Sequence, residues 1–151
     1  MTRIIAPVVL ALATGVLLDG CATIAADPEA RRLNSAVEQQ ASTFYAALPA
    51  KAAPDCGFDA SAPTYAAMRA DAAAMEAHTP EKDRAMRRAA AALTHVIDES
   101  ARSHQLASAS TDDRFGACMA PGAITLNADA VARATQTIER LQRERGAKGE
   151  R

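Results

Sequence analysis

Apolar and small side chains recur at steps of three and four along residues 27–146, a spacing that places them on one face of a helix. The pattern predicts four helices. The first begins at Asp27-Pro28 and ends before Pro54, and the second runs from about Ser61 to His78. The third follows Thr79 and continues to about Leu106. The apolar or small positions, in chain order, are Leu33, Val37, Gln40 or Ala41, Phe44 and Leu48, then Tyr65, Met68, Ala72 and Met75, then Met86, Ala90, Leu93, Ile97 and Ala101.

The fourth helix is predicted to begin between Pro121 and Asn127. Ile124, Val131 and Ile138 are seven residues apart, a register that favours the earlier start. Gly146 is expected to end this helix, because glycine commonly terminates helices. Residues 147–151 would then form a frayed tail.

Cap residues support the start of two of these helices. Asp27 precedes Pro28, and Thr79 precedes Pro80, so each pair offers a capping side chain followed by proline in the first helical position. We therefore expect Thr79 to cap the third helix. No alternating run is long enough to indicate a strand.

Four amphipathic helices with short connections predict an all-α, up-down-up-down four-helix bundle over residues 27–146. Cys56 lies in the first predicted loop, residues 51–58, and Cys118 lies in the third, residues 107–121. In this topology both loops are at the same end of the bundle. A disulfide joining the loops between helices 1 and 2 and between helices 3 and 4 is therefore geometrically natural.

Composition indicates a thin core. Hydrophobic residues make up 49% of the 151 residues, but 39 of the residues are alanine. Alanine favours helix while burying little area. The seam methionines Met68, Met75 and Met86 are expected to fill the core rather than to bind copper or haem. We expect such a bundle to depend on close helix packing and on the disulfide.

The N-terminal residues predict export. Arg3 is followed by fifteen uncharged residues, Ile4 to Leu18, which have the charge and length of a signal peptide. This run is shorter than the roughly 20 apolar residues of a spanning helix. We therefore assign residues 1–20 to a signal peptide, with a short permanent transmembrane helix as the alternative.

Leu18-Asp19-Gly20-Cys21 directly follows the apolar run and resembles the lipobox of bacterial lipoproteins. Asp19 stands where alanine, serine or threonine is usual. The resemblance implies that Cys21 carries lipid and becomes the first mature residue, with residues 21–26 as a tether. It also implies a periplasm-facing outer-membrane location, because Ala22 rather than aspartate follows the cysteine. Cleavage after Ala26 is the alternative and would give a soluble periplasmic protein.

The three cysteines fit this interpretation. Either cleavage takes Cys21 out of the pool of free thiols, and leaves Cys56 and Cys118. Two cysteines in an oxidising compartment predict one disulfide, with two buried thiols as the alternative. The chain contains neither a CxxC redox motif nor a CxxCH haem-attachment motif.

Known chemical motifs are not found. The formal charge of −1 lacks the basic excess of a nucleic-acid binder. His95 and His104 are nine residues apart and point to opposite sides of one helix, so we expect no metal and no cofactor. Ser100 and His104 are four residues apart, and we expect them on a solvated helix face. Basic residues near the C-terminus are a candidate contact with anionic lipid headgroups: Arg140, Arg143, Arg145, Lys148 and Arg151.

These features favour a non-enzymatic, lipid-anchored accessory or interaction protein of the bacterial envelope. Its expected partners are the membrane, through the lipid, and an envelope protein, with the oligomeric state left open. Phe58, Phe115 and Met119 lie near the predicted disulfide and are the candidate partner surface. The alternative is a periplasmic small-ligand or haem-binding bundle, which requires an interior cavity with convergent polar groups.

Overall fold

The computed structural model describes residues 27–110 and 118–149, and these form a four-helix bundle. The helices are α1 (Pro28–Ala47), α2 (Phe58–His78), α3 (Arg84–Ser108) and α4 (Pro121–Gly149), with a single 3-10 turn, η1 (Leu48–Ala50), after α1. The described ranges contain no strand. The all-α prediction is confirmed.

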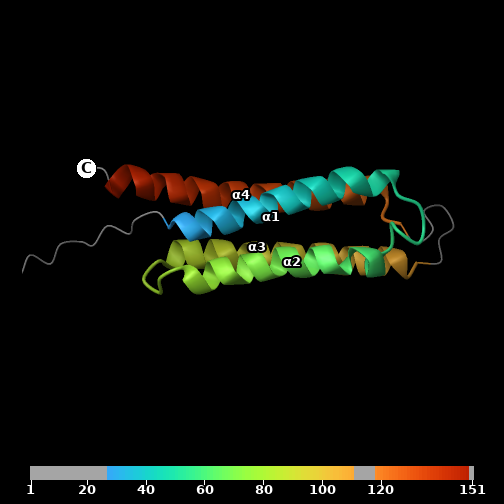
Figure 1. Ribbon diagram of the computed structural model, residues 1–151, viewed down its shortest axis with the longest axis horizontal. Coiled ribbons are helices and arrows are strands. Elements are labelled where there is room, and N and C mark those ends of the chain that lie inside the picture. Colours follow the sequence, from blue (N-terminus) through green and yellow to red (C-terminus); the bar gives the residue numbers. More distant parts are fainter. Residues whose placement is uncertain (1–26, 111–117, 150–151) are drawn as a thin grey trace, which may run out of the picture.

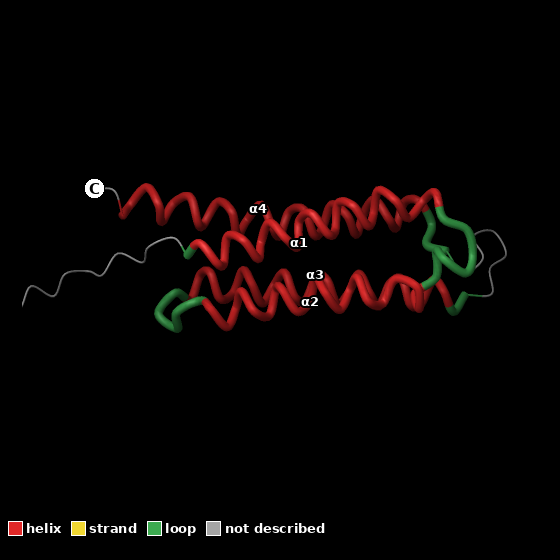
Figure 2. Tube along the Cα trace, viewed as in Figure 1, coloured by secondary structure: helices red, strands yellow, loops and turns green. Residues whose placement is uncertain are grey.

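The helices alternate in direction (Figures 1 and 2). Each helix contacts its two neighbours: α1 packs on α2 and α4, and α3 packs on α2 and α4. The connections from α1 to α2 and from α3 to α4 lie at one end, which we call the disulfide end. The start of α1, the α2–α3 turn and the end of α4 lie at the other, the terminal end. The up-down-up-down topology is therefore also confirmed.

The core follows the predicted helix faces. Met68, Met75, Leu93, Ile97 and Ile138 are fully or almost fully buried, and alanines between them lie at close helix contacts. Methyl side chains let neighbouring backbones approach, so the bundle packs with few large residues. The methionines on the seam are core residues, as predicted.

The start of α3 differs from the prediction. Thr79 does not begin α3 but ends α2, and its hydroxyl donates to the Met75 carbonyl at 2.8 Å. Asp83 caps α3 instead, because its carboxylate accepts the Met86 N–H at 3.1 Å. A threonine can satisfy a carbonyl at a helix end as well as an amide at a helix start. The Thr79-Pro80 pair thus marks the turn between helices.

Two other helix ends also differ. Helix α2 starts at Phe58, three residues before the expected Ser61. Helix α4 starts at Pro121, in agreement with the favoured register, but continues through Gly146 to Gly149. A side chain at Gly146 would meet nothing within 4 Å, and its φ is not in the left-handed region. Gly146 therefore lacks the conformation by which glycine ends helices, and the predicted end there is wrong.

At the start of α1, the capping prediction is confirmed. Asp27 accepts the Glu29 N–H at 2.9 Å, and Pro28 is the first helical residue. Among the helices described, none is long and apolar enough to cross a membrane. The predicted signal peptide, lipobox and tether, residues 1–26, lie outside the described residues.

Candidate functional site

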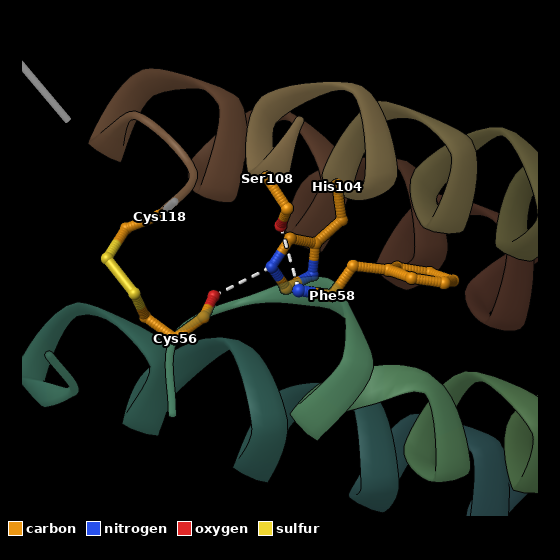
Figure 3. The surroundings of a disulfide bond; sticks show 5 residues. All are labelled: Cys56, Phe58, His104, Ser108 and Cys118. Atoms are coloured by element: carbon orange, nitrogen blue, oxygen red, sulfur yellow. Dashed lines mark hydrogen bonds between the residues drawn. A yellow bond between two sulfur atoms is a disulfide. The ribbon is translucent and has the colours of Figure 1, made fainter. Parts of the chain in front are cut away.

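A disulfide joins the two loops at the disulfide end. Cys56 and Cys118 are bonded, with their Cα atoms 5.1 Å apart and 62 residues apart in sequence (Figure 3). Cys56 is fully buried. The link ties the segment before α2 to the segment before α4, as the sequence predicted.

His104 holds the same segment by a second, noncovalent contact. Its Nε2 lies 2.8 Å from the Cys56 carbonyl oxygen, and its Nδ1 lies 3.3 Å from the Tyr65 hydroxyl. A carbonyl can only accept, so Nε2 carries the proton and donates. In the neutral ring Nδ1 then accepts from Tyr65. Both ring nitrogens are engaged, which makes His104 a structural link between α3, α2 and the disulfide loop.

Aromatic rings surround this histidine. The Phe44 and Tyr65 ring centroids are 5.2 Å apart in an edge-to-face arrangement, and Tyr65 and His104 are 5.8 Å apart in the same arrangement. Phe58 stacks on Tyr65 at 6.1 Å. Offset and edge-to-face pairs of this kind are favourable beyond the area they bury. The cluster therefore stiffens the disulfide end of an otherwise alanine-rich bundle.

Burial shifts the protonation equilibria of this cluster. Loss of solvent lowers the pKa of His104, although its hydrogen bond to the Cys56 carbonyl acts in the opposite direction. Burial likewise raises the pKa of Tyr65, and the neighbouring Tyr45 raises it further. Tyr45 has a raised pKa for the same principal reason. The cluster is consequently neutral at pH 7.

The first turn of α2 is capped from α3. Gly57 is the N-cap residue and has no side chain to offer, so the Ser108 hydroxyl accepts the Phe58 N–H at 2.8 Å (Figure 3). A side chain at Gly57 would lie 3.0 Å from the Pro54 carbonyl oxygen. Glycine thus permits the close turn after Pro54, and α3 supplies the missing cap.

The predicted partner surface is only partly available. Phe58 is half-buried and lines an open pocket of about 370 Å³ with Pro54, Gly57, Asp59, Gln105, Ser108 and Ala109. Met119 is 3% exposed and belongs to the core, so its assignment to the surface was wrong. Met119 directly follows Cys118 and belongs to the hydrophobic core cluster. Phe115 lies outside the described residues.

The prediction of a solvated Ser100/His104 face is also wrong. Ser100 is 2% exposed and His104 is fully buried. The i, i+4 spacing placed them together correctly, but on the core side of α3. Because both His104 nitrogens already have partners, the ring has no free nitrogen with which to activate Ser100.

The surroundings of His95 and His104 do not support a metal or haem site. His95 is exposed and His104 buried, on opposite sides of α3, as predicted. In the described ranges no group of three or more histidine, cysteine, aspartate or glutamate side chains is arranged to hold a metal. Met68, Met75 and His104 are fully buried.

A second polar site at the terminal end was missed from the sequence. Arg145 on α4 donates to the Asp83 carboxylate at 2.5 Å, and the two side chains are 14% and 4% exposed. Gln142, 2% exposed, lies beside them with neither amide atom hydrogen-bonded. These residues line a small cavity of about 60 Å³. In the sequence, Asp83 directly precedes a basic, amphipathic stretch, and this was the available signal for the site. Its partner on α4, Arg145, could not be predicted from the sequence.

Comparison of the chain with protein-family models, with curated proteins and with solved structures finds no match.

Proposed function

We propose that this chain is an exported lipoprotein, anchored through Cys21, whose helical bundle acts as a non-enzymatic interaction or accessory factor of the bacterial envelope. The observation that carries the proposal is Leu18-Asp19-Gly20-Cys21 directly behind fifteen uncharged residues. This order of charge, apolar run and cysteine is typical of a lipoprotein signal.

The geometry of the bundle supports one orientation for such an anchor. Five residues, 22–26, separate Cys21 from Asp27, and an extended chain of that length reaches about 20 Å. Helix α1 begins at the terminal end, so the anchor would hold that end beside the membrane. The 20 residues of α1 would carry the disulfide end about 30 Å outward.

The disulfide end is therefore the proposed partner surface. Its backbone is fixed by the Cys56–Cys118 bond, by His104 and by the cap on Phe58. A preordered surface loses little conformational entropy when it binds. The pocket beside Phe58 offers an aromatic ring next to the Asp59 carboxylate. This chemistry fits a protein segment that presents an apolar side chain beside a basic one.

Lipidation is tested by labelling cells that express the full chain with a palmitate analogue. The proposal predicts labelled wild-type protein in the membrane fraction and no label on Cys21→Ala. Label of equal intensity on Cys21→Ala would exclude Cys21 as the anchor. A Cys56→Ser variant serves as the matched cysteine control and should keep its label.

The partner surface is tested separately by photo-crosslinking in intact cells. A photoreactive residue replaces exposed Gln105, which lines the Phe58 pocket, and in a control replaces exposed Gln136 on α4. We expect a discrete adduct from position 105 that disappears when Phe58→Glu is added. Equal adducts from both positions, or none from position 105, would contradict the proposed surface.

A further inference from the structure

The two ends of the bundle differ in charge. The terminal end comprises residues 27–36, 74–90 and 136–149, which contain ten basic and seven acidic residues. The rest of the described chain contains four basic and seven acidic residues. The terminal end therefore has an excess of positive charge, and the rest of the described chain has an excess of negative charge.

Ion pairing leaves this positive excess exposed. Four basic residues at the terminal end are paired with acids: Arg32 with Glu29, Arg87 with Glu76, Arg143 with Glu139, and Arg145 with Asp83. Five more are exposed and make no ion pair within the described ranges: Arg31, Lys82, Arg84, Arg88 and Arg140. Three carboxylates there also lack an ion pair: Asp27, Glu81 and Glu144.

The exposed cations lie where a membrane surface would reach them. Lys82 is in the turn between α2 and α3, and Arg84 and Arg88 are in the first two turns of α3. This turn lies at the terminal end, where α4 extends beyond it (Figure 1). Arg84 and Arg88 are four residues apart and share one helix face. α1 also begins at this end, so the chain that leads to Cys21 leaves from the same side.

We propose that the terminal end of the bundle binds the headgroups of anionic phospholipids through Lys82, Arg84 and Arg88, as a second membrane contact beside the N-terminal anchor. Basic residues next to an anionic leaflet each contribute about fivefold to binding. A basic patch is a common second membrane signal beside a lipid anchor. The inference depends on the proposed anchor only for holding this end close to the bilayer.

The chain's own lysines allow a direct test. It has three, Lys51, Lys82 and Lys148, and exposed Lys51 and Lys82 lie at opposite ends of the bundle. The full chain is reconstituted into liposomes of phosphatidylcholine alone or with 30% phosphatidylglycerol. It is then acylated with a water-soluble amine reagent, and labelling is read by peptide mass spectrometry.

On the anionic liposomes we expect labelling of Lys82 to slow by about fivefold, the factor for one basic residue at such a surface, while Lys51 is unchanged. In 1 M salt, where the screening length is about 3 Å, this protection should disappear. Arg84→Glu/Arg88→Glu should also abolish it. The acid at position 84, the first residue of α3, is compatible with the helix dipole. The matched control Arg102→Glu/Arg133→Glu, at exposed positions away from this end, should retain it.

Equal labelling of Lys82 on neutral and anionic liposomes would overturn the proposal. Protection of Lys82 in cell envelopes but not on protein-free anionic liposomes would also overturn it, because the covering partner would then be a protein. An intact mass without lipid would contradict the proposed anchor, whereas the liposome comparison would still decide the headgroup contact. The two failures are thus distinguishable.

Discussion

The disulfide should contribute a large share of the stability of this bundle. Replacing Cys56 and Cys118 together with serine opens a loop whose ends are 62 residues apart. In the chain-entropy treatment, a closed loop of this length stabilises the folded state by about 4 kcal/mol, because the link restricts the unfolded chain. Domains of this size commonly have an unfolding free energy of about 5–15 kcal/mol, so the variant should be close to the limit of its stability.

The assay is urea denaturation followed by helical circular dichroism at 25 °C. It compares the oxidised wild type, the wild type in reductant and Cys56→Ser/Cys118→Ser. Reduced wild type and double variant should agree, and both should lie about 4 kcal/mol below the oxidised protein. A difference below about 1 kcal/mol would refute the reasoning, because the two loops would then be held together without the covalent bond.

Three further predictions concern buried polar residues. Because burial lowers the pKa of His104, the unfolded state binds a proton more readily, and stability should fall as pH decreases below about 6.5. His104→Gln should abolish that acid-side loss in urea titrations at pH 5 and 7.5; an unchanged pH dependence would contradict the assignment. Gln142→Leu removes a buried amide without hydrogen-bond partners, so it should raise the unfolding free energy by about 1 kcal/mol, and a decrease would show that the amide is satisfied. Asp83→Ala removes the α3 cap and the partner of Arg145, so it should lower the unfolding free energy by about 2 kcal/mol, more than Thr79→Ala does. If thermal melts show the larger loss of stability for Thr79→Ala, Thr79 is the principal cap.

Much of the fold could be predicted because it depends on local periodicity. The seven-residue spacing of Ile124, Val131 and Ile138 identified the buried face and the early start of α4. The cap at Asp27 was also identified correctly. The same cap-then-proline pattern at Thr79 was misread because a second capping residue, Asp83, lay four residues later. Sequence alone did not decide between the two.

The candidate site depends on contacts between distant segments, which periodicity does not encode. The Cys56 carbonyl meets His104 across 48 residues, and Arg145 meets Asp83 across 62. The i, i+4 relation of Ser100 and His104 was visible, but polar side chains on a helix ordinarily face water. His104 is held inside by Tyr65 and the disulfide loop, whose positions only the assembled bundle defines.

The most direct test of the proposed anchor is the intact mass of the protein extracted from bacterial membranes. A lipoprotein processed at Cys21 predicts a mature chain of residues 21–151 with the added mass of a diacylglyceryl group on Cys21. It also predicts two hydrogens fewer for the Cys56–Cys118 bond. An unmodified chain that begins at Asp27, or one that retains residues 1–20, would contradict the lipid anchor.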